Sequence, residues 1–203
     1  MKLVAIHIFR WVNEAPVLLG SELELSMLWF YQRGMAKEHV NFNTRLVAGR
    51  TPPGTKARIS LEKDVGICYC WTTTDGISVT AVCDNEYPEN GIFMMINKLI
   101  LEFREKYAPT GILETADRDQ DLKWDRIEWY MKEWQNPHNA DKLLKVEKEL
   151  MEVNEIMRKN MSDLIKRGET IDDLMAKSKD LSTASVSFYK KAKKANTRCC
   201  DLY

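Results

Sequence analysis

Apolar residues recur every three and four positions along the last third of the chain, and the residues between them are mostly charged or serine. This spacing averages 3.5 residues and no proline interrupts it, so it predicts one long coiled-coil helix of about 80 Å. One helix cannot cover such a stripe by itself, and partner helices are therefore expected. The predicted layer positions are Leu143, Val146, Leu150, Val153, Met157, Asn160, Leu164, Arg167, Ile171, Leu174, Ser178, Leu181, Ser185, Phe188, Ala192 and Ala195.

Arg167 is the cation among these layer positions. A guanidinium inside a bundle is costly unless acceptors on the facing helices satisfy its donors, and it then fixes register and partner choice. The alternative is that its side chain extends from the edge of the coil into water. Gly168 and Asn160 weaken the helix locally, so we expect the free segment to be largely unfolded until partners bind.

Patterns typical of strands and of two amphipathic helices fill the first part of the chain. Turn residues such as Asn13-Glu14 and Thr74–Gly76 separate the strand-like runs. Two strands, a helix, three strands and a helix predict an α+β domain with mostly antiparallel strands. The expected strands are 3–11, 15–23, 57–63, 65–72 and 77–84, and the expected helices are 29–49 and 88–103.

A third amphipathic helix is predicted within residues 117–134, where apolar residues recur from Trp124 to Trp134. Two interpretations remain open: this helix closes the first domain, or it docks the carboxyl-terminal coil. Residues 135–139 contain Pro137 and are predicted to form a hinge.

Size and charge narrow the function classes. The chain has 203 residues, enough for one domain of about 130 residues plus an extension. Thirty basic and thirty acidic residues give no net charge, which argues against a general affinity for nucleic acid. No apolar run reaches the roughly 20 residues of a spanning helix, and the amino end lacks the pattern of a signal peptide. We therefore expect a cytoplasmic protein.

Candidate catalytic chemistry is missing from the sequence. His7, His39 and His138 fall in no recognisable nucleophile or carboxylate constellation, and no glycine-rich phosphate-binding motif occurs. Cys68 and Cys70 share one face of a predicted strand but have no further ligand at metal spacing. These cysteines are expected to be small buried side chains, as is Cys83. We predict no enzyme activity, no cofactor and no metal site.

The carboxyl terminus combines a basic run with paired cysteines. Five cations and no acid lie within residues 188–198, directly before Cys199 and Cys200. Such a run gains about 1 kcal/mol per charge beside an anionic leaflet, although cations also suit an ordinary helix end. Cys200 holds the prenylation position of a C-a-a-X box, with Cys199 as a second lipid acceptor. Asp201 and Tyr203 are unusual in that box, which leaves palmitoylation as the other route.

The run from Leu164 to Leu174 resembles the centre of an R-SNARE motif, in which one arginine faces three glutamines from partner helices. Residues 178–200, with Phe188-Tyr189-Lys190 and the paired cysteines, resemble the lipid-anchored longin R-SNAREs of the Ykt type. Similar motifs in the first domain are Gln32-Arg33, Phe42, Thr44-Arg45-Leu46 and Asp84-Asn85-Glu86-Tyr87-Pro88.

This resemblance implies a profilin-like longin domain, a five-stranded mostly antiparallel sheet with helices on its faces, followed by a SNARE coiled-coil helix. The implied boundaries are 1–134 for the longin domain, 135–139 for the hinge, 140–198 for the R-SNARE motif and 199–203 for a lipidated tail.

The resemblance further implies a role in vesicle-mediated transport. The motif would form a four-helix bundle with three Q-SNARE helices, with Arg167 in the ionic layer, and thereby drive membrane fusion. Prenyl and palmitoyl groups on Cys199 and Cys200 would anchor the protein on Golgi, endosomal or vacuolar membranes. In a closed cytoplasmic state the longin domain would cover the motif and the lipid, with Phe42 in the docking surface. Plain core packing is the alternative for Phe42.

Two other functions fit the same residues. The stripe could pair with itself in a coiled-coil scaffold, in which case Arg167 is incidental. The chain could also be a longin-type regulator that binds a small GTPase or a sorting coat and takes no part in fusion.

Overall fold

The structure is a computed structural model that describes residues 2–61, 66–120, 122–135 and 155–198. The chain divides into two compact units, which are described separately. The sheet unit comprises Met1–Glu24 and Thr44–Leu164, and the helical unit comprises Leu25–Asn43 and Ile165–Tyr203.

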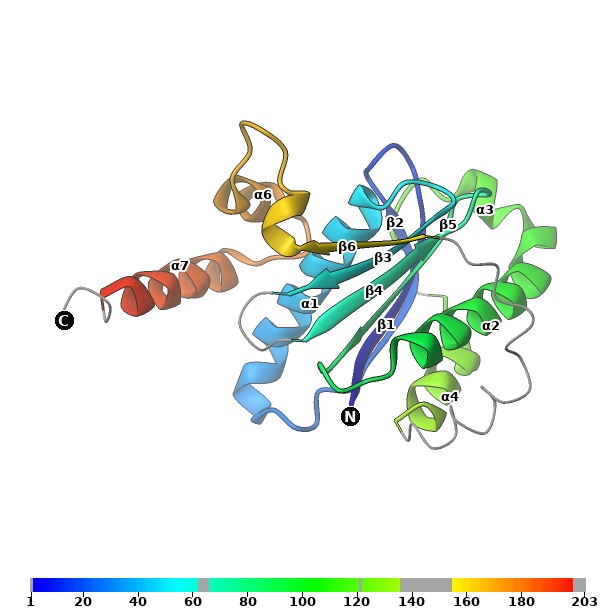
Figure 1. The fold of residues 1–203 in the computed structure, drawn as a ribbon, viewed down its shortest axis with the longest axis horizontal. Coiled ribbons are helices and arrows are strands. Elements are labelled where there is room, and N and C mark those ends of the chain that lie inside the picture. The colour runs from blue at the N-terminus through cyan, green and yellow to red at the C-terminus, as the bar shows by residue number, and fades with distance from the viewer. Residues whose placement is uncertain (1, 62–65, 121, 136–154, 199–203) are drawn as a thin grey trace. The chain divides into compact units, whose positions relative to one another are not determined.

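Six strands form one sheet in the order β2-β1-β5-β4-β3-β6 (Figure 1). Neighbouring strands are antiparallel except β3 and β6, which are parallel. The five predicted strands are confirmed, whereas β6 is an addition to the expected five-stranded sheet and comes from the predicted coiled coil. The strands are β1 (Leu3–Arg10), β2 (Val17–Leu23), β3 (Thr55–Ser60), β4 (Ile67–Thr72), β5 (Ile77–Cys83) and β6 (Ile156–Asn160).

The three helices expected before residue 135 are also present. The short elements η1 and α3 between α2 and α4 were not predicted. The helical elements are α1 (Phe30–Arg50), α2 (Glu89–Tyr107), η1 (Ala108–Thr110), α3 (Ile112–Thr115), α4 (Asp125–Glu133), η2 (Met161–Leu164), α6 (Ile171–Lys177) and α7 (Thr183–Arg198).

The turn between β1 and β2 follows the prediction. Asn13 and Glu14 have φ angles of 44° and 65°, the left-handed pair that joins antiparallel strands tightly. The two strands pair from Arg10↔Val17 to Ala5↔Leu23, with one irregularity beside Ile8. A two-residue signal in the sequence thus fixes this edge of the sheet.

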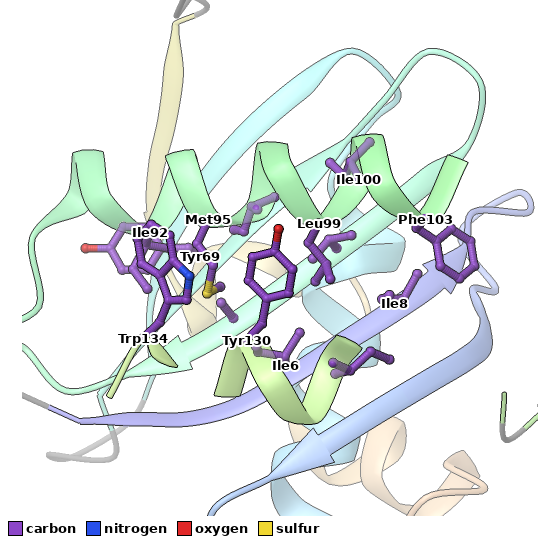
Figure 2. Close-up of a cluster of buried hydrophobic side chains, with 14 of the residues drawn as sticks. Ile6, Ile8, Tyr69, Ile92, Met95, Leu99, Ile100, Phe103, Tyr130 and Trp134 are labelled. Carbon is purple, nitrogen blue, oxygen red and sulfur yellow. The ribbon is translucent and has the colours of Figure 1, made fainter. Parts of the chain in front are cut away.

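The main hydrophobic core lies on the sheet face that α2 and α4 cover (Figure 2). The apolar stripe of α2, which includes Met95, Leu99 and Phe103, packs on strand side chains such as Ile6 and Ile8. These side chains are at most 2% exposed, so the face excludes water.

The tryptophan-rich segment belongs to this core. Trp124 lies 5.5 Å from the Phe103 ring and 5.8 Å from Tyr107, centroid to centroid. Trp134 is buried, and its carbonyl accepts a hydrogen bond from the Tyr87 hydroxyl at 2.5 Å. The structure therefore favours the first interpretation, in which this helix closes the first domain.

An acid–base pair joins α4 to α2. Arg126 donates two hydrogen bonds of 2.8 Å to the Glu102 carboxylate, and the Tyr130 hydroxyl donates a third of 2.9 Å. The Arg126 hydrogen bonds hold the pKa of Glu102 below its ordinary value of 4.5. The carboxylate is thus a stabilising group wherever it is ionised in the folded chain.

We expect a Glu102→Gln variant to lose part of the acid sensitivity of the wild type. A lowered folded-state pKa contributes stability that is present above the unfolded pKa and is lost as pH falls through the folded one. The difference in unfolding free energy between wild type and variant is expected to shrink between about pH 5 and about pH 3. Urea unfolding at several pH values measures it, and Glu105→Gln, an exposed change on the same helix, is the control. A pH-independent difference would contradict the assignment.

The opposite sheet face carries the end of α1 and two of the cysteines that were predicted to be buried. The Arg45 guanidinium lies 5.5 Å from the Phe9 ring centroid and donates to the Pro16 carbonyl at 2.6 Å. Cys68 and Cys70 alternate with core residues of β4 and are both buried, as predicted. Burial raises the pKa of both thiols, which keeps them protonated and unreactive.

No group of three or more His, Cys, Asp or Glu side chains is placed to hold a metal ion within the described ranges. In the same part of the chain, no helix combines the length and hydropathy needed to cross a bilayer.

Candidate protein-interaction site in the carboxyl-terminal segment

The uninterrupted helix predicted from Leu143 to Ala195 is wrong for the described residues. Residues 155–198 instead form β6, η2, α6 and α7; η2 follows β6 directly, and turns separate the later elements. Gly168 adopts φ +88°, and Ser178 ends α6 in an extended conformation, so both positions break the helix. The first four layer positions, Leu143, Val146, Leu150 and Val153, lie outside the described residues, as do residues 136–139 of the predicted hinge.

β6 places two layer positions in a strand. Met157 pairs with Ala57 of β3, and Asn160 pairs with Ser60. The backbone groups that would close helical turns are used by the neighbouring strand, so the strand and helix forms of this segment exclude one another. The competing interaction is tertiary and about 100 residues away in sequence, which explains why local periodicity did not reveal it.

An ion-pair network ties β6 to the start of α2. Arg158 donates to Glu89 at 2.7 Å, and Arg58 of β3 lies 3.6 Å from the same carboxylate. Glu89 also belongs to the first turn of α2, where a negative charge suits the helix dipole. None of these residues was singled out from the sequence. Glu89 and Arg158 are 69 residues apart in the sequence, so no local pattern predicts that they form an ion pair.

η2 carries the segment's apolar anchors in the sheet unit. Met161 and Leu164 are buried, and Leu164 is a predicted layer position. Asp163 accepts a hydrogen bond from the Asn160 amide at 2.9 Å and so holds the turn after β6. Apolar positions expected to face partner helices therefore have an internal partner in the free chain.

Arg167 lies in the turn between η2 and α6, and its side chain is exposed. The Glu169 side chain accepts from the Lys166 amide at 3.2 Å, and Gly168 supplies the left-handed residue of the turn. No bundle surrounds Arg167 in this single chain. Its guanidinium is displayed to solvent, where a partner's acceptors can reach it.

In the helical unit, the start of α7 binds the first half of α1. The Ser182 amide donates to Glu38 Oε2 at 2.8 Å, and this hydrogen bond is the largest cause that lowers the pKa of Glu38. The Tyr189 ring lies 5.9 Å from His39, whose pKa burial lowers. Ser185, a layer position, is fully buried.

The other layer positions of this unit differ in exposure. Ile171, Leu174, Ser178 and Leu181 are half-buried, whereas Phe188 is exposed; Ala192 and Ala195 lie on α7. Thr170 caps α6 by accepting from the Asp173 amide at 3.1 Å, which explains where this helix begins.

Three further predicted residues have mixed outcomes. Phe42 on α1 is buried at 6% exposure, which leaves its role as a docking residue a prediction. Cys199 and Cys200 lie outside the described residues.

The predicted hinge begins with a residue that is firmly held. The Gln135 amide nitrogen donates to the Leu3 carbonyl at 2.6 Å, and its oxygen accepts from the Leu3 amide at 3.2 Å. These two hydrogen bonds tie residue 135 to the first strand of the sheet unit.

Comparisons with known proteins match both parts of the chain. Residues 28–126 match the longin family, described as a regulated-SNARE-like domain, and residues 142–200 match the synaptobrevin family. The VAMP-like protein YKT61 of Arabidopsis thaliana is 33% identical over 204 residues, covering all of both chains. The synaptobrevin homologues of Schizosaccharomyces pombe and Saccharomyces cerevisiae are 34% and 30% identical, with 98% of each chain covered.

The two family matches occur in the order that the sequence motifs predicted, and the α+β sheet with its helices agrees with the first of them. SNAREs are trafficking proteins and not an enzyme family. The chain belongs to the Ykt-type longin-domain R-SNAREs, which act in vesicle trafficking.

Proposed function

We propose that this R-SNARE alternates between a closed form, in which its own domain holds the motif, and a four-helix bundle with three Q-SNARE helices. The observation that carries the proposal is the pairing of β6 with β3. A segment that forms the sixth strand of the sheet is unavailable as a bundle helix, so assembly requires that β6 leave the sheet.

Two further contacts support the closed form, each within its own unit. Burial of Met161 and Leu164 removes apolar surface that would otherwise be exposed, at roughly 25 cal/mol per Å². The hydrogen bond from Ser182 to Glu38 satisfies an amide beside the start of α7. We assign Phe42 to the same docking function, on the basis of its burial on α1.

In the bundle, Arg167 is proposed to face three glutamine side chains in the central layer. Replacing it with alanine is expected to destabilise the Q-SNARE complex by about 3 kcal/mol, because the glutamines lose their charged partner inside a dry layer. Thermal melting of the SDS-resistant complex formed by the full chain and three Q-SNARE helices measures the effect. Lys166→Ala, an exposed neighbour outside the layers, is the control.

Equal melting temperatures for the wild-type and Arg167→Ala complexes would contradict the ionic-layer assignment. Failure of the wild type to form a complex with any Q-SNARE set would contradict the proposed bundle itself. Sedimentation of the free wild type separates this function from a self-paired scaffold, since an R-SNARE of this kind is expected to be monomeric before Q-SNARE helices are added.

The anchor is proposed to be covalent lipid on Cys199 and Cys200, assisted by the basic run before them. One chain gives only marginal membrane attachment, so a prenyl group with a palmitoyl group, or one lipid with the cations, is required. Cycling between the cytoplasm and Golgi, endosomal or vacuolar membranes follows from such an anchor. The work of fusion comes from bundle folding, and this chain is proposed to consume no cofactor.

A further inference from the structure

A cluster of exposed aromatic side chains lies at the start of α1. The described part of the chain exposes seven large apolar side chains, and four of them fall between residues 27 and 31. Met27 is 47% exposed, Trp29 73%, Phe30 87% and Tyr31 71%. We call these four residues the aromatic turn. Contiguous exposed apolar surface of this kind marks an interaction site more often than a scattered residue does.

The aromatic turn has a fixed shape. The Arg33 guanidinium donates to the Leu28 carbonyl at 3.0 Å and to the Ser26 carbonyl at 3.1 Å. The Leu28 amide donates to Leu25 at 3.0 Å, and Gln32 donates to Trp29 at 2.8 Å. A turn that is already ordered loses little conformational entropy when it binds.

Charge is segregated between the two units of this neutral chain. The helical unit contains eleven basic and six acidic residues, a net charge of +5, so the sheet unit carries −5. The stretch 25–37, which contains the aromatic turn, has two cations, Arg33 and Lys37, and no acid. Lys190 and Lys191 on α7 of the same unit are exposed. The helical unit therefore has the polarity of a surface that binds anions.

The aromatic turn and the basic run of α7 lie on different sides of α1. Phe30 and His39 are nine residues apart on one helix, or about 14 Å along its axis. Tyr189 contacts His39, and the basic run begins at the next residue. Nine residues turn an α-helix through about 900°, so Phe30 and His39 point to opposite sides of α1. Arg33 and Lys37, which are both exposed, lie on the Phe30 side.

We propose that the aromatic turn is a second membrane contact of this protein, inserted at headgroup level into an anionic phospholipid bilayer. Tryptophan and tyrosine favour the membrane–water interface, where the ring is apolar and its polar atom stays hydrated. Arg33 and Lys37, on the same side of α1 as Phe30, supply attraction to the anionic leaflet. This contact needs no lipid modification, and it would orient α1 on a membrane to which the carboxyl-terminal anchor only tethers the chain.

The test uses the full chain with Cys199→Ser and Cys200→Ser, so that neither cysteine can carry lipid. Flotation is measured with phosphatidylcholine vesicles that contain either no phosphatidylserine or about 30% of it. Trp29→Ser/Phe30→Ser is expected to weaken binding to the anionic vesicles by about 10- to 100-fold, since two interfacial aromatic side chains are lost. Binding to the neutral vesicles is expected to be weak for every variant.

Leu101→Ser/Trp129→Ser is the matched control, because it removes two exposed apolar side chains from the sheet unit. Its binding is expected to stay within about twofold of the starting chain. Lipids brominated near the headgroup are also expected to quench the tryptophan fluorescence of the starting chain more than that of Trp29→Phe. Phe30→Gln alone repeats the test if circular dichroism shows that the double variant is misfolded.

Equal vesicle binding by the starting chain and the Trp29→Ser/Phe30→Ser variant would overturn the proposal. Equal binding to neutral and anionic vesicles would overturn the assignment of an anionic bilayer as the partner. Concentration-dependent dimerisation that the variant abolishes, with vesicle binding unchanged, would assign the aromatic turn to a second copy of the chain instead. These measurements contain no Q-SNAREs, so their failure is distinct from failure of the proposed bundle.

Discussion

A disulfide between β3 and β6 is expected to block entry of the SNARE motif into a Q-SNARE bundle. Ser60 and Asn160 are paired in the parallel register. Adjacent strands lie about 4.8 Å apart, inside the range of Cα separations that disulfides span. In the oxidised Ser60→Cys/Asn160→Cys protein, residue 160 cannot leave the strand to become a helical layer. Assembly with Q-SNARE helices is therefore expected to slow by at least about 100-fold.

Reduction provides the internal control for this experiment. Adding a reductant to the same sample is expected to restore assembly to the rate of the single variant Asn160→Cys. Cys199→Ser and Cys200→Ser are included throughout, so that the new pair does not exchange with the terminal cysteines. If the oxidised protein assembles as fast as the reduced one, pairing of β6 with β3 does not restrain the motif.

The second large effect is on stability. Trp124→Ala is expected to lower the unfolding free energy of the sheet unit by about 3–5 kcal/mol, the usual cost of deleting a buried tryptophan. The ring lies against Phe103 and Tyr107, and its removal leaves a cavity between α2 and the segment that leads into α4. Urea unfolding followed by circular dichroism measures the change.

Trp129→Ala is the matched control for that loss. Trp129 is 44% exposed; the Arg126 guanidinium lies 4.1 Å from its ring centroid, and the Tyr130 ring lies 5.1 Å away. Its replacement is expected to cost less than about 1 kcal/mol. A similar loss for both variants would mean that Trp124 is not part of the central packing of the sheet unit.

Local patterns were sufficient to predict most of the sheet unit. Strand-like runs between turn residues identified the strands, and helical spacing identified the stripe of α2, which buries one face against the sheet. Asn13, a residue type that tolerates left-handed backbone, marked the first hairpin. The short elements η1 and α3 lack such periodicity and were therefore missed.

The carboxyl-terminal segment shows where sequence patterns stop being informative. Its 3.5-residue spacing is the pattern of the proposed bundle, a state that needs partner helices. In the free chain, Met157 instead pairs with β3, and Leu164 is buried in η2. The residues that hold this alternative, Glu89 and Arg158, are ordinary surface charges when read locally.

The position of β6 at the border of the sheet has a consequence for the open molecule. In the proposed open form, in which β6 has left the sheet, β3 becomes an edge strand with an unpaired row of amide and carbonyl groups, a known template for aggregation. β3 carries Lys56, whose ammonium lies 4.1 Å from the Trp71 ring, and Arg58 two residues later. Cations on an edge strand act as gatekeepers against intermolecular pairing. The six residues of β3 thus pair with the chain's own β6 and, when β6 is absent, disfavour pairing with a strand of another molecule.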